Sequence, residues 1–154
     1  MNRRFLYGAL CTTIIVLDRV TKYWALYVLE GEHTVNNFLS YMCVLNRGVT
    51  WGMLHAQHEW LFVGVTILVM MMTGVLVRYT YARAQKGHVI IGELMVLAGS
   101  LSNIADRILY KGVVDFIVVS YGKYSWPIFN IADAAIVIGV GVMLISRWYD
   151  NDTT

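Results

Sequence analysis

The run GSLSNIADRILYKGVVDFIVVSYGKYSWPIFNIADAA, residues 99–135, governs the interpretation of the whole chain. It carries three carboxylates, Asp106, Asp115 and Asp133, and each lies in apolar sequence. A buried carboxylate without partners is costly, so such groups are usually paired, protonated or functional. Asp115 and Asp133 are too far apart to share one helix face, and Pro127 lies between them. We therefore expect the chain to turn back here and bring the two acids together as an aspartyl dyad at a membrane surface.

The composition is typical of an integral membrane protein. Of the 154 residues, 58% are hydrophobic and only 14% are charged, against about 25% in soluble domains. The net charge of +2 is too small to indicate a nucleic-acid partner. No Cys-x-x-Cys motif is present, which argues against thiol redox chemistry and cysteine-bound zinc. His55 and His58 have the spacing of a metal-binding pair, but no third ligand is evident, so we expect no metal and no other cofactor.

Four apolar segments have about the length that crosses a bilayer, which takes roughly 20 helical residues. They are residues 5–28, 60–77, 89–109 and 129–146. The first follows a pair of arginines, as in a signal peptide, but charged residues rather than a cleavage site come after its apolar run. We therefore expect it to remain uncleaved. The sequence predicts one membrane domain, residues 1–154, with four transmembrane helices.

The segments between these spans differ in character. Residues 30–59 combine polar residues, glycines and short, weakly alternating apolar runs, which predicts a small β-rich region on the membrane surface. Within this region, Asn46 begins the sequence NRGVTWG. Its side chain can donate and accept hydrogen bonds to a peptide, although a turn is the simpler interpretation. Residues 112–127 are too short and too interrupted to span, so we expect a surface-lying or re-entrant segment.

Polar residues near the ends of the spans form candidate pairs. Asp18 and Lys22 are four residues apart on one helix face and can form an ion pair. A structural pair and a direct role with substrate are equally open for them. Asn103 and Arg107 also share a helix face. We expect Asp106 to be the ion-pair partner of the neighbouring Arg107.

The distribution of Lys and Arg indicates the orientation in the membrane. One side holds six of these residues, which are Arg3, Arg4, Arg78, Arg83, Lys86 and Arg147. The other side holds five, or six if Arg19 is counted, and the five are Lys22, Arg47, Arg107, Lys111 and Lys123. This narrow margin places both termini in the cytoplasm. The polar residues singled out above then converge from separate stretches at the extracytoplasmic face.

Two carboxylates in one low-dielectric pocket cannot both ionise cheaply, so one keeps a proton. The ionised member can take a proton from a bound water, and the protonated member can polarise a carbonyl and later assist the leaving amine. All four histidines lie in loop-like sequence, which makes nucleophilic catalysis less favoured than acid–base peptide hydrolysis. Asn130, three residues before Asp133, either caps the last helix or orients a carboxylate, and taken alone it is expected to be the cap.

Two other classes of function are compatible with intramembrane acids. A proton-coupled transporter or channel subunit uses such acids, but usually nearer the middle of the bilayer and often within internal repeats. A non-catalytic membrane scaffold would tolerate the loss of either acid. A cleavage assay with and without the two acids separates these alternatives from a peptidase.

Five motifs follow one another along the chain: D-x-x-T-K, N-x-G-x-x-W-G, G-x-x-x-N-x-x-D-R, GVVDF and F-N-x-A-D. Together they resemble the lipoprotein signal peptidases (signal peptidase II), small four-span aspartic proteases of the bacterial inner membrane, and the resemblance covers nearly the whole chain. It implies that Asp115 and Asp133 are the catalytic pair. It also implies a substrate site lined by four residues, which are Asn46, Asn103, Arg107 and Asn130.

The implied reaction removes the signal peptide from a prolipoprotein, just before its diacylglyceryl-modified cysteine. The implied fold has four transmembrane helices, a small extracytoplasmic β-cradle and a surface helix, and residues 30–59 and 112–127 fit the two additions. The implied partners are the lipid-modified precursor and membrane lipid, and we expect a monomer. The chain departs from the family pattern at Ser102, where glycine is common, and at Trp51, where phenylalanine is usual.

Overall fold

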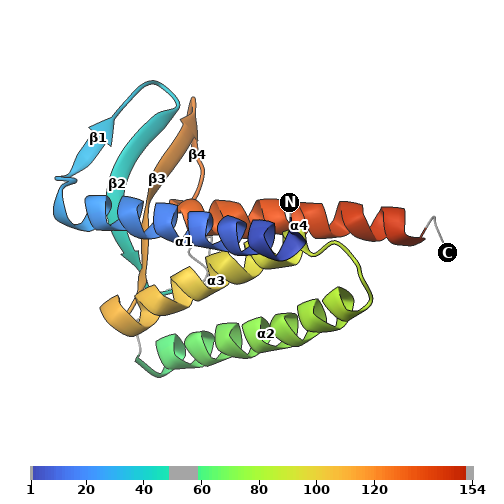
Figure 1. Ribbon diagram of the computed structural model, residues 1–154. Coiled ribbons are helices and arrows are strands. Elements are labelled where there is room, and N and C mark those ends of the chain that lie inside the picture. Colours follow the sequence, from blue (N-terminus) through green and yellow to red (C-terminus); the bar gives the residue numbers. More distant parts are fainter. Residues whose placement is uncertain (1, 49–58, 152–154) are drawn as a thin grey trace.

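The computed structural model describes residues 2–48 and 59–151. The helices are α1 (Arg3–Tyr27), α2 (Glu59–Gln85), α3 (Ile91–Tyr110) and α4 (Ile131–Asn151), and the strands are β1 (Glu32–Thr34), β2 (Leu39–Asn46), β3 (Val113–Tyr121) and β4 (Tyr124–Ser125). The four helices form a bundle, and the strands form a sheet at one end of it (Figure 1). Both termini and the α2–α3 connection lie at the other end (Figure 1).

Local signals explain where several helices begin and end. The side chain of Asn2 accepts a hydrogen bond from the Arg4 N–H at 3.1 Å and so caps α1. Helix α2 continues to Gln85, beyond the apolar segment 60–77, because helix-compatible residues follow the apolar run. At the end of α3, Lys111 adopts a left-handed conformation with φ of 57°, which reverses the chain into β3.

Helices α3 and α4 are in backbone contact at two points. A β-carbon on Gly92 would lie 2.7 Å from the carbonyl oxygen of Gly139, and a β-carbon on Gly99 would lie 2.5 Å from that of Ala132. No larger side chain fits at either position without moving a helix. The second contact fixes the first turn of α4, which carries Asp133, against α3.

The sheet has the order β1-β2-β3-β4, with every neighbouring pair antiparallel. After β4 the chain runs back beside β3, where the N–H groups of Phe116 and Ile117 donate to the carbonyl of Phe129 at 3.1 and 2.9 Å. This return brings the start of α4 next to the strand that carries Asp115. The turn-back predicted around Pro127 is therefore confirmed.

The prediction for residues 112–127 was wrong in its secondary structure. The surface helix that the family resemblance implied for this segment is absent, because the segment forms β3 and β4. Its run of β-branched residues favours a strand, and both edges of β3 find hydrogen-bonding partners. Within 30–59, strands β1 and β2 confirm the β-rich prediction for the described part, whereas Trp51, His55 and His58 lie outside the described residues.

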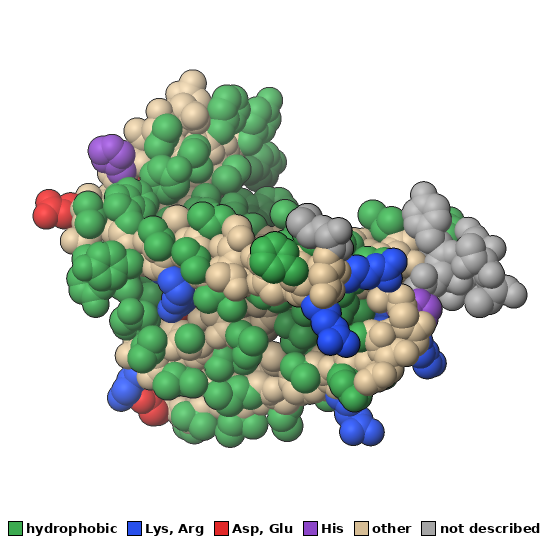
Figure 2. Space-filling model, viewed as in Figure 1, with side chains coloured by type: hydrophobic (Ala, Val, Ile, Leu, Met, Phe, Trp, Pro, Cys, Tyr) green, Lys and Arg blue, Asp and Glu red, His purple; other side chains and the backbone are tan. Residues whose placement is uncertain are grey.

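The surface of the bundle is largely apolar, as Figure 2 shows for one face. In the described residues, α2 and α4 are long and apolar enough to cross a membrane, with mean hydropathies of 2.3 and 1.7 over windows that are only 17% buried. Exposed apolar faces of this extent are unfavourable in water but suit a lipid environment. The described part of the chain is mostly helical, with a small sheet at one end of the bundle, and its exposed apolar surface is that of a membrane protein.

Candidate active site

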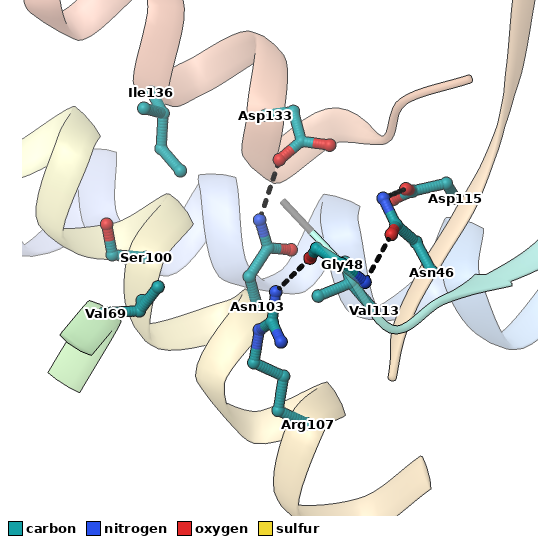
Figure 3. A pocket seen from close by; sticks show the side chains of 10 residues that line it. All are labelled: Asn46, Gly48, Val69, Ser100, Asn103, Arg107, Val113, Asp115, Asp133 and Ile136. Atoms are coloured by element: carbon teal, nitrogen blue, oxygen red, sulfur yellow. Dashed lines mark hydrogen bonds between the residues drawn. The ribbon is translucent and has the colours of Figure 1, made fainter. Parts of the chain in front are cut away.

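A pocket of about 140 Å³ lies where α2, α3 and α4 meet the sheet (Figure 3). Its walls include Asn46, Asn103, Arg107, Asp115 and Asp133. These five residues come from β2, α3, β3 and α4, so the fold brings together side chains that are far apart in the sequence. The remaining predicted residues, Asp18, Lys22, Asp106 and Asn130, are fully buried behind this wall.

Asp115 lies on β3, and its side chain is held by two amides. Asn46 donates to one carboxylate oxygen at 2.9 Å, and Asn130 donates to the other at 2.7 Å. Burial, and then the charge of Asp133, raises the pKa of Asp115 to about 7, although both amide hydrogen bonds act in the opposite direction. This carboxyl group therefore exchanges its proton near neutral pH.

Asp133 lies in the first turn of α4 and forms a reciprocal cap with Asn130. The Asn130 side-chain oxygen accepts from the Asp133 N–H at 2.8 Å, and the Asp133 carboxylate accepts from the Asn130 N–H at 3.3 Å. The other oxygen of Asp133 accepts from the amide of Asn103 at 2.8 Å (Figure 3). Both carboxylate oxygens are thereby fixed in position.

Asn130 connects the two acids. Its oxygen binds the backbone of Asp133 while its NH2 group donates to Asp115, and the residue has no exposed surface. The two roles proposed for Asn130, helix cap and orientation of a carboxylate, are therefore both observed in its hydrogen bonds. The acids come from different elements, and one amide links them.

Arg107 reaches into the pocket from α3. One guanidinium nitrogen donates to the Gly48 carbonyl at 2.7 Å, and the group lies over the ring of Phe62 at 5.6 Å. Within the described residues, its buried Nη1 has no hydrogen-bond partner. The predicted ion pair between Asp106 and Arg107 was wrong, because adjacent helical residues point in different directions. Arg107 is left with a donor suited to a carbonyl or another anionic oxygen.

Behind the pocket, Asp106 belongs to a buried ionic cluster with α1. Lys22 contacts Asp18 at 2.8 Å and Asp106 at 2.7 Å, and Arg19 contacts the same two acids at 3.1 and 2.7 Å. The predicted pair of Asp18 and Lys22 is confirmed as part of this cluster. The hydroxyl of Ser102, one of the departures from the family pattern, donates to Asp18 at 2.7 Å.

The two acids of the cluster also hold the backbones that carry the two pocket acids. Asp18 accepts from the N–H of Ala132 at 2.8 Å, and Asp106 accepts from the N–H of Val114 at 3.2 Å. Ala132 immediately precedes Asp133, and Val114 immediately precedes Asp115. The cluster therefore fixes strand β3 and the first turn of α4 relative to α1 and α3.

The sequence profile of signal peptidase (SPase) II matches residues 10–149. The chain belongs to this family. A lipoprotein signal peptidase of Geobacillus thermodenitrificans is 37% identical over 150 residues, covering 96% of this chain and 92% of that protein. One from Clostridium novyi is 39% identical over 135 residues, covering 85% of this chain and 89% of its own length.

Solved structures agree with this family assignment. A bacterial membrane enzyme solved at 2.3 Å resolution superposes with a TM-score of 0.78 and 25% identity, covering 97% of this chain and 91% of that one. A second bacterial membrane enzyme, solved at 1.9 Å, superposes with a TM-score of 0.73 and 26% identity, covering 92% of each chain. The fold of this signal peptidase II family member is therefore that of membrane enzymes.

Sequence reasoning missed several residues of the site in this signal peptidase II family member. Arg19 completes the ionic cluster, and its position directly after Asp18 was the available signal. Val69 and Ile136 line the pocket from α2 and α4. Apolar residues in apolar spans all look alike in sequence, so nothing marked these two.

Proposed function

We propose that this chain is a prolipoprotein signal peptidase, an aspartic endopeptidase that cuts just before the diacylglyceryl-modified cysteine. The observation that supports this most is the meeting of Asp115 and Asp133 in one pocket, where Asn130 links them. Membership of the signal peptidase II family supplies the reaction. We assign the catalytic role to these two acids.

In the proposed mechanism the dyad holds one proton near neutral pH, consistent with the pKa of about 7 for Asp115. The ionised carboxylate takes a proton from a water molecule, whose oxygen attacks the carbonyl carbon of the scissile peptide. The protonated carboxyl gives its proton to the carbonyl oxygen. The tetrahedral intermediate then collapses: one of its hydroxyl groups returns a proton to the dyad as the carbonyl re-forms, the C–N bond breaks, and the amine of the modified cysteine leaves with the other proton of the dyad.

The other pocket residues are proposed to hold the substrate peptide. Arg107 has a buried donor without a partner among the described residues, and it faces the pocket that holds both acids. Asn46 lines the same pocket and already donates to Asp115. We propose that both bind backbone carbonyls of the precursor, and that Asn103 and Asn130 orient the acids.

We further propose that all four helices cross the bacterial inner membrane, with both termini in the cytoplasm and the pocket towards the extracytoplasmic side. Helices α1 and α3 are 25 and 20 residues long, and the charges of Asp18, Lys22 and Asp106 are paired inside the bundle, as membrane burial requires. In Figure 2, most of the visible Lys and Arg side chains lie towards the end with the termini. We propose that the enzyme acts as a monomer surrounded by lipid.

The test is cleavage of a diacylglyceryl-modified precursor by purified protein. We expect Asp115→Asn and Asp133→Asn each to lose about 10²–10⁴-fold in rate, and the double variant to be little worse than either, because the two acids act as a unit. Glu32→Gln, at an exposed acid on β1, is the control. A folded single variant that retains more than about a tenth of the wild-type rate would refute the dyad.

A further inference from the structure

Lys22 is a buried cation whose three donors are all in use. Its ammonium contacts Asp18 at 2.8 Å, Asp106 at 2.7 Å and the side-chain oxygen of Asn103 at 2.8 Å. Only 1% of the residue is exposed, and it does not line the pocket. Arg19 also pairs with both acids, so the cluster holds two positive and two negative charges. The hydrogen bond from Lys22 to Asn103 is therefore not needed to neutralise a charge.

The contact to Asn103 determines which way its amide points. An ammonium can only donate hydrogen bonds, so the atom of Asn103 that faces Lys22 must be the oxygen. The NH2 group is then turned to Asp133, to which it donates at 2.8 Å. Because an NH2 group can only donate, this oxygen of Asp133 must act as an acceptor.

We propose that Lys22 is a positioning residue for the cleavage reaction: its ammonium fixes the amide of Asn103 and thereby holds Asp133 with an accepting oxygen on that side. This inference rests on the proposed function of Asp133. Lys22 itself touches neither the pocket nor a reacting atom. In its absence, the Asn103 oxygen keeps only the longer contact from the Asn130 amide at 3.3 Å, so the Asn103 amide can turn over and present its oxygen to Asp133.

The charge of Lys22 also acts on the pair of acids. Among the residues that the structure describes, the charged or titratable groups around Lys22 and the dyad are Asp18 and Arg19 of α1, Cys43 of β2, Asp106 and Arg107 of α3, Asp115 of β3 and Asp133 of α4. Among the causes that act on Asp115, Lys22 lowers its pKa. Loss of this cation therefore makes deprotonation of the dyad harder, which moves the acidic limb of the pH–rate profile to higher pH.

The experiment measures kcat, KM and the pH profile for a diacylglyceryl-modified precursor. We expect Lys22→Met to lose about tenfold or more in kcat with little change in KM, and to shift the acidic limb of the profile to higher pH. Because this change leaves an excess negative charge in the cluster, the double variant Lys22→Met/Asp106→Asn restores the charge balance. We expect the double variant to regain melting temperature but not kcat. Lys86→Met, at an exposed lysine in the α2–α3 connection, is the matched control.

Several results would overturn the positioning role. One is a folded Lys22→Met protein with the wild-type kcat and pH profile. Another is a double variant that regains activity together with stability, because Lys22 would then serve the fold alone. If neither variant folds, the role of Lys22 is likewise structural and the positioning role is refuted. If the wild-type protein does not cleave the precursor, the proposed function fails first. An active wild type with an unaffected Lys22→Met variant refutes only the role of Lys22.

Discussion

Replacing Asp115 with asparagine should slow cleavage by about 10²–10⁴-fold and also stabilise the protein above neutral pH. In the folded protein the pKa of Asp115 is about 7, against an ordinary value of 3.8, mainly because the side chain is buried. Between these two pH values the folded state binds more protons than the unfolded state. The free energy of unfolding therefore falls as pH rises from about 4 to 7, and the loss is complete above the folded pKa.

The size of the effect follows from the two pKa values. At about 1.36 kcal/mol per pKa unit, the difference between 3.8 and about 7 corresponds to at most roughly 4 kcal/mol of destabilisation at pH 8. Asparagine does not titrate and escapes this cost. However, Asn46 and Asn130 both donate to Asp115, and one of them loses its acceptor in the variant, which costs about 1–3 kcal/mol. The net gain at pH 8 is then about 1–3 kcal/mol.

Thermal unfolding in detergent at pH 4.5 and pH 8 measures this difference. At about 2–4 °C per kcal/mol, the melting temperature of Asp115→Asn should exceed that of the wild type by roughly 5 °C at pH 8, and the advantage should vanish at pH 4.5. Asp106→Asn is the matched control, because Asp106 is paired with Lys22 and Arg19, and its loss should destabilise at both pH values. A lower melting temperature for Asp115→Asn at pH 8, or a difference that does not change with pH, would refute the reasoning.

Three further outcomes are expected. Arg107→Ala should lower kcat/KM for the precursor by about 10–100-fold while the protein still folds, since a buried donor in the pocket is lost; an unchanged kcat/KM would contradict its proposed contact with substrate. Asp18→Asn should lower the melting temperature in detergent more than the activity per folded molecule, because breaking a buried ion pair costs roughly 3–5 kcal/mol; the reverse result would move Asp18 into the site. Reporters fused after Thr154 and within 79–86 should report the cytoplasm and one within 32–37 the outside, and a cytoplasmic signal from 32–37 would contradict the orientation.

The helices and the two acids could be predicted from the sequence because their signals are local. Long apolar runs are visible without any knowledge of the fold, and so is a carboxylate such as Asp115 surrounded by apolar residues. Strand β3 could not be predicted in the same way. The run VVDFIVV is apolar on both faces, and its assignment as a strand depends on pairing with β2, some 70 positions away in the chain. Hydrogen bonds between distant segments leave no mark on local periodicity.

The ionic partners were harder to predict for a related reason. The pair of Asp18 and Lys22 follows from helical spacing, whereas the contacts of Asp106 with Lys22 and Arg19 depend on how α1 packs against α3. Sequence proximity suggested Arg107 as the partner of Asp106. Helix geometry turns adjacent side chains about 100° apart, so proximity in sequence was misleading here.

The placement of the proposed dyad explains why so many charges are buried behind it. Replacing buried ion pairs with apolar residues is often neutral or stabilising, so the cluster of Asp18, Lys22 and Asp106 is poorly explained by stability alone. What the cluster does provide is a fixed position for two backbone N–H groups, one in β3 and one in α4, each directly before an acid of the pair. The proposed proton-sharing pair works only if its two carboxyl groups keep their separation, and these groups stand on a strand and a helix that the return of the chain after β4 brings together. Directional hydrogen bonds to buried charges hold such a separation more tightly than apolar contacts, which are not directional. We therefore interpret the ionic cluster as the support that keeps the side chains of Asp115 and Asp133 at a fixed separation.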